Sequence, residues 1–74
     1  MSAISYHEAK AIVLARLRRI IESLPVAERS MPRIAINMRP YSYLDLLREV
    51  QMDTDVGRAY VYMVAKQLGY VITG

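Results

Sequence analysis

The stretch Arg33–Pro40, RIAINMRP, alternates large apolar side chains with small or polar ones until it reaches a proline. Side chains of a β-strand point to opposite faces in turn, so Ile34, Ile36 and Met38 would share one face. The other face would carry Arg33, Ala35, Asn37 and Arg39. Pro40 should end the strand because proline has no backbone N–H for a ladder. We therefore expect one strand over 33–38, whose polar face either contacts nucleic acid or is the solvated side of a small sheet.

A helix is expected on the amino-terminal side of this strand. Ser5 and Glu8 have the S-x-x-E spacing of a capping box, in which each side chain hydrogen-bonds the backbone N–H of the other residue. Beyond them, apolar residues recur at the spacing of one helical face. That face comprises Tyr6, Val13, Leu17, Ile20, Ile21 and Leu24. The sequence predicts an amphipathic helix over 5–24, followed by a connector over 25–32 between two prolines.

Two further helices are expected after the strand. Ser42 can cap the first, with Asp45 near the positive end of its dipole. Its inward residues would be Leu44, Leu47 and Val50, with Leu46 beside them. Asp53 or Thr54 can cap the second, and Gly69 would end it in a left-handed conformation. This second helix is apolar almost all round, so it lies either in the core or between subunits.

The tail YVIT, residues 70–73, is rich in β-branched residues and is a candidate for a short strand. The order is then helix, strand, helix, helix and a last short strand. We therefore expect a single domain over 1–74 of the small, mostly helical α+β class. In this domain a strand-helix-helix unit over 33–74 follows the amino-terminal helix and its connector.

The composition indicates a partner. A chain of 74 residues has a marginal core of its own, and without cysteine it has no disulfides and no cysteine-based metal or redox site. Yet 54% of its residues are hydrophobic, above the usual share of about 45–50%. We therefore expect a homodimer in which part of the apolar surface is buried between copies. The expected contact comprises Ile34, Ile36, Tyr60, Val61, Val64 and Leu68.

Enzyme and metal chemistry have little support in the sequence. The single histidine, His7, opens HEAKA, but position 11 is alanine, so the second ligand of an H-E-x-x-H zinc site is missing. The stretch DTDVG begins like a calcium loop, but Val64 stands where the bidentate glutamate would be needed. We therefore expect no catalysis, no cofactor, no metal site and no small-molecule substrate.

No signal peptide and no apolar run of about 18 residues is recognisable in the chain. We expect a soluble cytoplasmic protein that does not enter a membrane. Its net charge of +3 is mildly basic and suits nucleic acid or an acidic partner.

The segment INMRPYSYLDLLREV, residues 36–50, resembles the ribbon-helix-helix repressors of the Arc and MetJ type. An alternating strand closed by proline and followed by two helices carries the likeness, which extends over 33–68. The resemblance implies a dimer whose strands pair antiparallel and enter the major groove of DNA. It also implies that Arg33, Asn37 and Arg39 face the bases, where arginine pairs with guanine and asparagine with adenine.

A second resemblance competes with the first. Residues 42–72, SYLDLLREVQMDTDVGRAYVYMVAKQLGYVI, are similar to a winged helix-turn-helix, in which a recognition helix leads into a β wing. This resemblance implies that Arg58 and Lys66 are the basic residues of the recognition helix. Both resemblances imply a small DNA-binding protein, a dimeric module like those of transcriptional regulators. The alternative is a non-enzymatic protein-interaction module or accessory subunit without a nucleic-acid role, which the apolar excess and the acidic stretch DTD favour.

Overall fold

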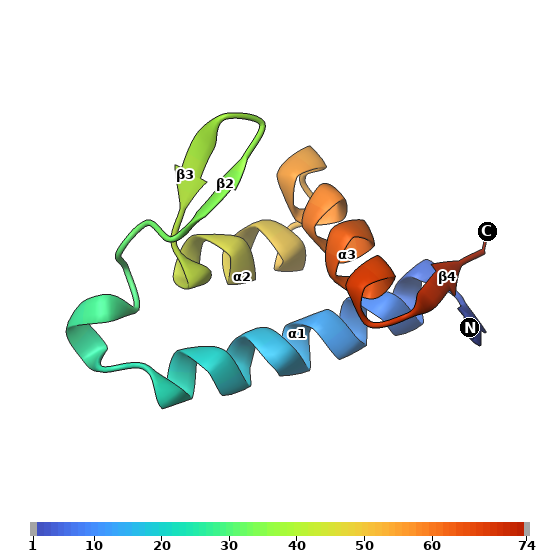
Figure 1. Cartoon of the computed structure of the whole chain (residues 1–74), viewed down its shortest axis with the longest axis horizontal. Helices are drawn as coiled ribbons and strands as arrows, with labels where there is room; N and C mark the ends of the chain where they lie inside the picture. Colours follow the sequence, from blue (N-terminus) through green and yellow to red (C-terminus); the bar gives the residue numbers. More distant parts are fainter. Residues whose placement is uncertain (1, 74) are drawn as a thin grey trace.

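The long helix α1 (Tyr6–Ser23) forms the base on which the shorter helices α2 (Tyr43–Gln51) and α3 (Asp55–Gln67) pack. The structure is a computed structural model that describes residues 2–73, and Figure 1 shows α1 along its lower edge. Two small two-stranded sheets accompany these three helices in residues 2–73. The predicted class, a small and mostly helical α+β fold, is therefore confirmed.

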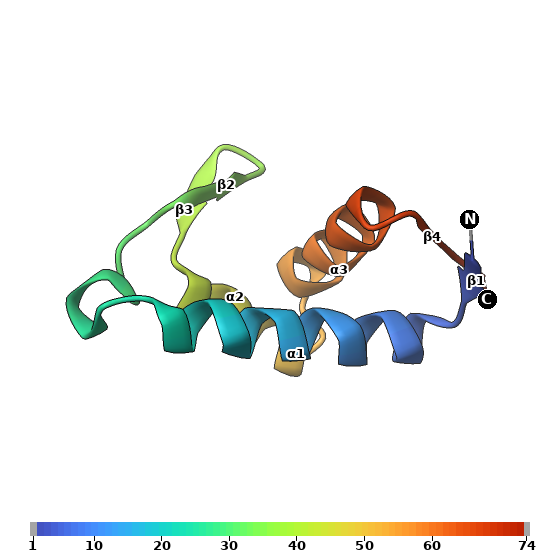
Figure 2. The same cartoon turned by 60° about the horizontal axis from the view of Figure 1, so that its bottom comes forward.

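Short strands complete the fold. β2 (Ile34–Ile36) and β3 (Arg39–Tyr41) form an antiparallel hairpin, while β1 (Ser2–Ile4) and β4 (Tyr70–Ile72) pair in parallel. A 3₁₀ turn, η1 (Val26–Glu28), lies in the connector after α1. In Figures 1 and 2 the hairpin and α3 rise from the same side of α1, and the β1–β4 pair lies at the end away from the hairpin.

The predicted helix boundaries agree with the structure because each depends on a local cap. Ser5 Oγ accepts a hydrogen bond from the Glu8 N–H at 3.1 Å, and Glu8 Oε1 accepts one from the Ser5 N–H at 3.3 Å. Thr54 caps α3, since its Oγ1 accepts from the Gly57 N–H at 3.1 Å. Gly69 follows α3 with a φ of +88°, the left-handed conformation expected of it.

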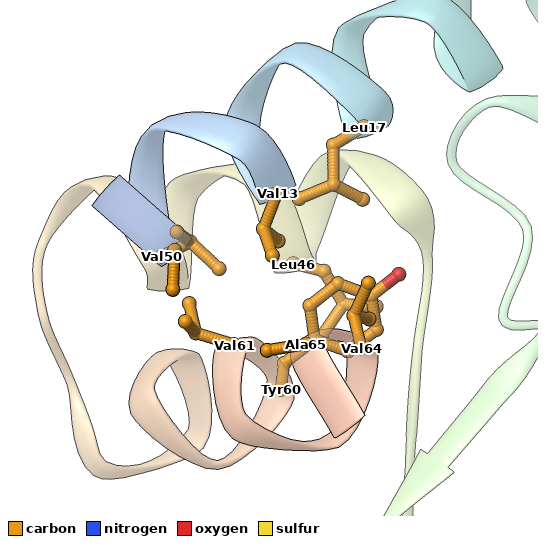
Figure 3. Close-up of a cluster of buried hydrophobic side chains, with 9 residues drawn as sticks. Val13, Leu17, Leu46, Val50, Tyr60, Val61, Val64 and Ala65 are labelled. Carbon is orange, nitrogen blue, oxygen red and sulfur yellow. The ribbon is translucent and has the colours of Figure 1, made fainter. Parts of the chain in front are cut away.

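The core is a single cluster to which all three helices contribute (Figure 3). Its buried side chains are Ala9, Val13 and Leu17 of α1, Leu46 and Val50 of α2, and Tyr60, Val61, Val64 and Ala65 of α3. The predicted face of α1 is confirmed at Val13, Leu17 and Ile21, which are buried. Leu44 was expected to point inward, but it is 41% exposed because the buried stripe of α2 runs through Leu46 and Val50.

Three residues expected between copies of the chain lie inside the subunit. Tyr60, Val61 and Val64 are each no more than 4% exposed, and they pack on α1 and α2 of the same chain. Ile34 and Ile36 are half-buried against the same core. Leu68, at 41% exposed, remains on the surface. The apolar excess of α3 is thus used largely within one subunit.

The prediction of one strand over 33–38 that ends at Pro40 is wrong. Asn37 and Met38 have φ values of 51° and 67°, which make a two-residue hairpin turn, and the chain returns as β3 through Pro40. Ile36 and Arg39 flank the turn as a hydrogen-bonded pair, so the next pair, Ala35 and Pro40, lies where the N–H groups point away from the partner strand. The missing N–H of Pro40 therefore breaks no ladder bond.

The β1–β4 pair joins the two ends of the described chain. Ser2 lies opposite Tyr70 and Ile4 opposite Ile72, and the Thr73 N–H donates to the Ile4 carbonyl oxygen at 2.8 Å. β4 agrees with the predicted strand at 70–73, whereas β1 was not predicted. Because the two strands are far apart in sequence, no local sequence pattern could have predicted that they pair.

At Gly57 the backbone of α3 comes very close to the backbone of α2. A β-carbon at this position would lie 2.1 Å from the Glu49 carbonyl oxygen and 2.7 Å from the Val50 nitrogen. Both are backbone atoms of α2 and cannot rotate away as a side chain would. The two helices therefore meet backbone to backbone at this glycine.

Gly57→Ala should destabilise the protein by about 3 kcal/mol or more, because the added methyl group forces α3 away from α2 and loosens the core. Gly69→Ala is the matched control, since a β-carbon there meets nothing within 4 Å and only the positive φ is unfavourable, at about 1–2 kcal/mol. Urea unfolding monitored by circular dichroism measures both. If Gly57→Ala is no worse than Gly69→Ala, the two helices do not touch at this position.

Ser42→Ala should lower the free energy of unfolding by about 0.5–2 kcal/mol, because the Asp45 N–H loses the buried Ser42 Oγ, which accepts from it at 3.0 Å. The backbone and side-chain hydrogen bonds of Ser42 hold the pKa of Asp45 below its ordinary value. The wild type should therefore lose this stabilisation as the pH falls through that lowered pKa, and the variant should lose less. Urea unfolding at neutral and acidic pH tests this, with the exposed Ser30→Ala as control. Equal stability of Ser42→Ala and wild type would contradict the capping role.

Candidate nucleic-acid interface

The positive charge of the chain is concentrated in one segment. Residues 16–41 carry six arginines and two glutamates, a net charge of +4, whereas 42–73 carry three cations and four acids, a net charge of −1. Residues 16–41 form the second half of α1, the connector and the hairpin, which together make the left end of the molecule in Figure 1. We call this region, residues 16–41, the arginine-rich end.

Some of these arginines have structural partners. Arg33 forms an ion pair with Glu28, which ties the start of the hairpin to η1. Arg29 Nε donates a hydrogen bond to the Leu24 carbonyl oxygen at 3.1 Å and so closes the connector over the end of α1. The other four form no ion pair with the carboxylates of residues 2–73, and their side chains are exposed: Arg16, Arg18, Arg19 and Arg39. These four are therefore free to meet phosphates.

The hairpin does not present the polar face that the sequence predicted. The cross-strand pairs Ile36–Arg39 and Ile34–Tyr41 put Arg39 on the same face as the isoleucines, at the tip, beyond the reach of the core. The opposite face of the ribbon carries only Ala35 and Pro40. The four residues expected on one outward face are therefore separated: Arg33 before β2, Ala35 within it, Asn37 in the turn and Arg39 on the other strand.

One chain supplies both strands of the antiparallel ribbon, whereas the ribbon-helix-helix resemblance implied one strand from each of two chains. β2 pairs with β3 through a two-residue turn, and this short connection brings Asn37, Met38 and Arg39 together at an exposed tip. Sequence reasoning named Asn37 and Arg39 but overlooked the turn. Asparagine favours the positive φ of a tight hairpin turn, and this was the signal that could have shown it.

Arg58 belongs to a different part of the molecule. Its guanidinium carbon lies 4.9 Å from the centre of the Tyr6 ring, and that ring lies 5.8 Å from the ring of Tyr62. Burial and the nearby charge of Asp53 raise the pKa of Tyr6, whose hydroxyl has no hydrogen-bond partner among residues 2–73. Arg58 thus helps to hold α3 on the first turn of α1, away from the hairpin.

The start of α3 is acidic. Asp55 lies in its first turn and Asp53 in the turn just before it, and Asp53 Oδ2 forms an ion pair with Lys10 Nζ at 2.9 Å. This pair fastens the α2–α3 turn to α1. A phosphate approaching the N-terminus of α3 would meet these two carboxylates. The structure therefore does not unite Arg58 with Arg33, Asn37 and Arg39 in one surface.

An apolar groove lies at the other end of the molecule, where α3 meets β4. It has a volume of about 380 Å³, and sequence reasoning did not find it. Tyr62 and Val71, two of its lining residues, are 47% and 44% exposed. The groove is lined by Tyr62, Ala65, Lys66, Gly69, Tyr70, Val71 and Ile72. Its lining comes from one face of α3 and from β4. The spacing of apolar residues in the sequence predicts each element separately and cannot predict a groove formed between the two.

Other kinds of site are not formed by the described residues. Within residues 2–73, no three histidine or acidic side chains gather in a way that could hold a metal ion. None of the helices in the same range has the length and apolar character needed to cross a membrane. Comparisons of the chain with protein-family models, curated proteins and solved structures found no match. Function is therefore inferred from the geometry.

Proposed function

We propose that the protein binds double-stranded DNA through its arginine-rich end, with the β2–β3 hairpin in a groove of the duplex. The observation that carries the proposal is the net charge of +4 on residues 16–41, the segment that runs from the second half of α1 through the β2–β3 hairpin. Lysines and arginines that neutralise phosphates supply most of the affinity of a protein for DNA. Proteins that read DNA with a β-ribbon or a small sheet place their strands in the major or the minor groove.

The residues of this end have different roles in the proposal. Arg39 and Asn37 lie at the hairpin tip, where they reach base edges or the sugar-phosphate walls of the groove. Arg16, Arg18 and Arg19 on the second half of α1 supply phosphate contacts beside it. Arg33 acts through its ion pair with Glu28, which positions the hairpin relative to α1.

The hairpin is a better candidate for the DNA contact than α3. Two carboxylates stand at the start of α3, and the cation on its first turns, Arg58, is engaged with Tyr6. A wing after α3 also finds no counterpart in the described chain, because β4 pairs in parallel with β1. The hairpin precedes the two helices and carries cations at its tip and base.

We further propose that the protein is a homodimer joined at the groove of α3 and β4. Tyr62 and Val71 expose large apolar surface there, and each strand of the β1–β4 pair has an edge that no strand of residues 2–73 covers. Antiparallel pairing of β4 with its copy about a twofold axis would cover one of these edges and the groove together. The groove also favours the second candidate function, a non-enzymatic module that binds another protein.

Arg39→Ala should weaken binding to a short duplex by about 1–3 kcal/mol, because the variant lacks the guanidinium that contacts the DNA. The protein should stay folded, because Arg39 is exposed at the hairpin tip. Removing Arg18 and Arg19 together should lower the slope of log affinity against log salt by about 1.8. Fluorescence anisotropy with a labelled duplex at several salt concentrations measures both effects. Arg48→Ala is the control, since it removes one exposed positive charge on α2, outside both the arginine-rich end and the groove. Equal losses in Arg39→Ala and Arg48→Ala, or no binding by the wild type, would refute the proposed interface.

Val71→Lys should convert the dimer to a monomer that keeps its fold, because a charged side chain would be buried in the groove contact. Light scattering after size exclusion at micromolar concentration gives the mass, and circular dichroism reports the fold. Met52→Lys is the matched control, since Met52 is exposed at the end of α2, outside the groove. A monomeric wild type, or a dimer that survives Val71→Lys, would contradict this interface.

A further inference from the structure

Met38 is exposed to a degree that the fold does not explain. Its side chain is 98% exposed, more than any other large hydrophobic residue among residues 2–73. It sits at the tip of the hairpin, and no neighbouring side chain of the subunit covers it. An apolar side chain held in water at the outermost point of a hairpin contributes nothing to folding by burial.

The backbone at Met38 is also unfavourable. Its φ of 67° places a bulky side chain in the left-handed region, where the second position of such a turn ordinarily holds glycine. Asn37, with a φ of 51°, is a residue type that tolerates this region. Strained residues at exposed positions are typical of functional sites, where the surrounding structure holds them.

The neighbours of Met38 indicate what it meets. Asn37 and Arg39 flank it in the sequence and are both exposed, so the exposed apolar side chain shares the tip with an amide and a guanidinium. The hairpin belongs to the arginine-rich end, whose net charge is +4. Proteins that bind the minor groove combine asparagine and arginine contacts with an apolar wedge between base pairs, and methionine is one of the side chains so used. A single methionine buries too little apolar area to hold a protein on a bilayer.

We propose that Met38 is a wedge that inserts between two adjacent base pairs from the minor groove and kinks the duplex. Asn37 and Arg39 hold the hairpin tip in the groove on either side of the wedge. This inference rests on the proposed DNA binding and adds to it the groove, the inserted residue and the bending of the DNA. Pyrimidine–purine steps are the expected sites because they unstack most easily.

Met38→Gly tests the role of the Met38 side chain in DNA binding separately from any effect on folding. Glycine suits the positive φ of the turn, so the melting temperature of the full-length variant should equal or exceed that of the wild type. Affinity for a random-sequence duplex that contains TA steps should fall about 10- to 100-fold, the ratio that corresponds to burial of one methionine side chain. Met31→Gly is the matched control, because Met31 is an exposed methionine in the connector of the same arginine-rich end.

Two optical signals report the wedge directly. The fluorescence of 2-aminopurine placed beside a TA step should rise when the wild type or Met31→Gly binds, and it should not rise with Met38→Gly. Energy transfer between dyes at the two duplex ends should increase with the same two proteins, because the kink shortens the end-to-end distance.

The outcomes distinguish this inference from the proposed function. If Met38→Gly binds and bends the duplex as the wild type does, or if the wild type binds without either signal, the wedge is refuted and DNA binding stands. If the wild type binds no duplex, both are refuted. Binding of the wild type, but not of Met38→Gly, to phosphatidylserine vesicles in the absence of duplex unstacking would also overturn the inference, in favour of a lipid surface.

Discussion

The backbone contact between α2 and α3 at Gly57 is the constraint on which the rest of the structure depends. No side chain separates the helices there, because a β-carbon would overlap the Glu49 carbonyl group. The Thr54 hydroxyl secures the same corner, since it accepts from the Gly57 N–H and donates to the Glu49 carboxylate at 2.8 Å. With the corner fixed, Tyr60 and Val61 are held against α1, and α3 is directed toward the β1–β4 pair.

This arrangement separates two surfaces of different chemistry. The arginine-rich end includes the hairpin, whereas the apolar groove is lined by residues of α3 and β4. The hairpin and β4 lie at opposite ends of the molecule in Figure 1. The acidic start of α3 lies between them and is fastened to α1 by the Lys10–Asp53 ion pair. A duplex at one end and a second copy at the other would not compete for the same residues. The proposed functions are therefore compatible in one small domain.

Most residues in special backbone conformations are of the types that prefer them, but Met38 at the hairpin tip is not. Gly69 occupies the left-handed position that ends α3, and Thr54 caps the same helix at its start. Met38 takes a conformation better suited to glycine and keeps its side chain in water. Natural sequences tend to depart from local preference where a function requires it. The tip of the hairpin is such a place, and the proposal for Met38 gives that departure a physical reason.

The sequence by itself determined the parts of the protein that depend on a few neighbouring residues. The capping boxes of Ser5 and Ser42, the glycine after α3 and the apolar face of α1 all act over one or two helical turns, so their patterns could be recognised. The turn at residues 37–38 also lay within reach of sequence reasoning. Only the tertiary structure decided that Val61 packs inside the subunit, because an apolar helix looks the same in a core and at an interface. It alone decided the β1–β4 pairing, since that pairing brings together residues at opposite ends of the described chain.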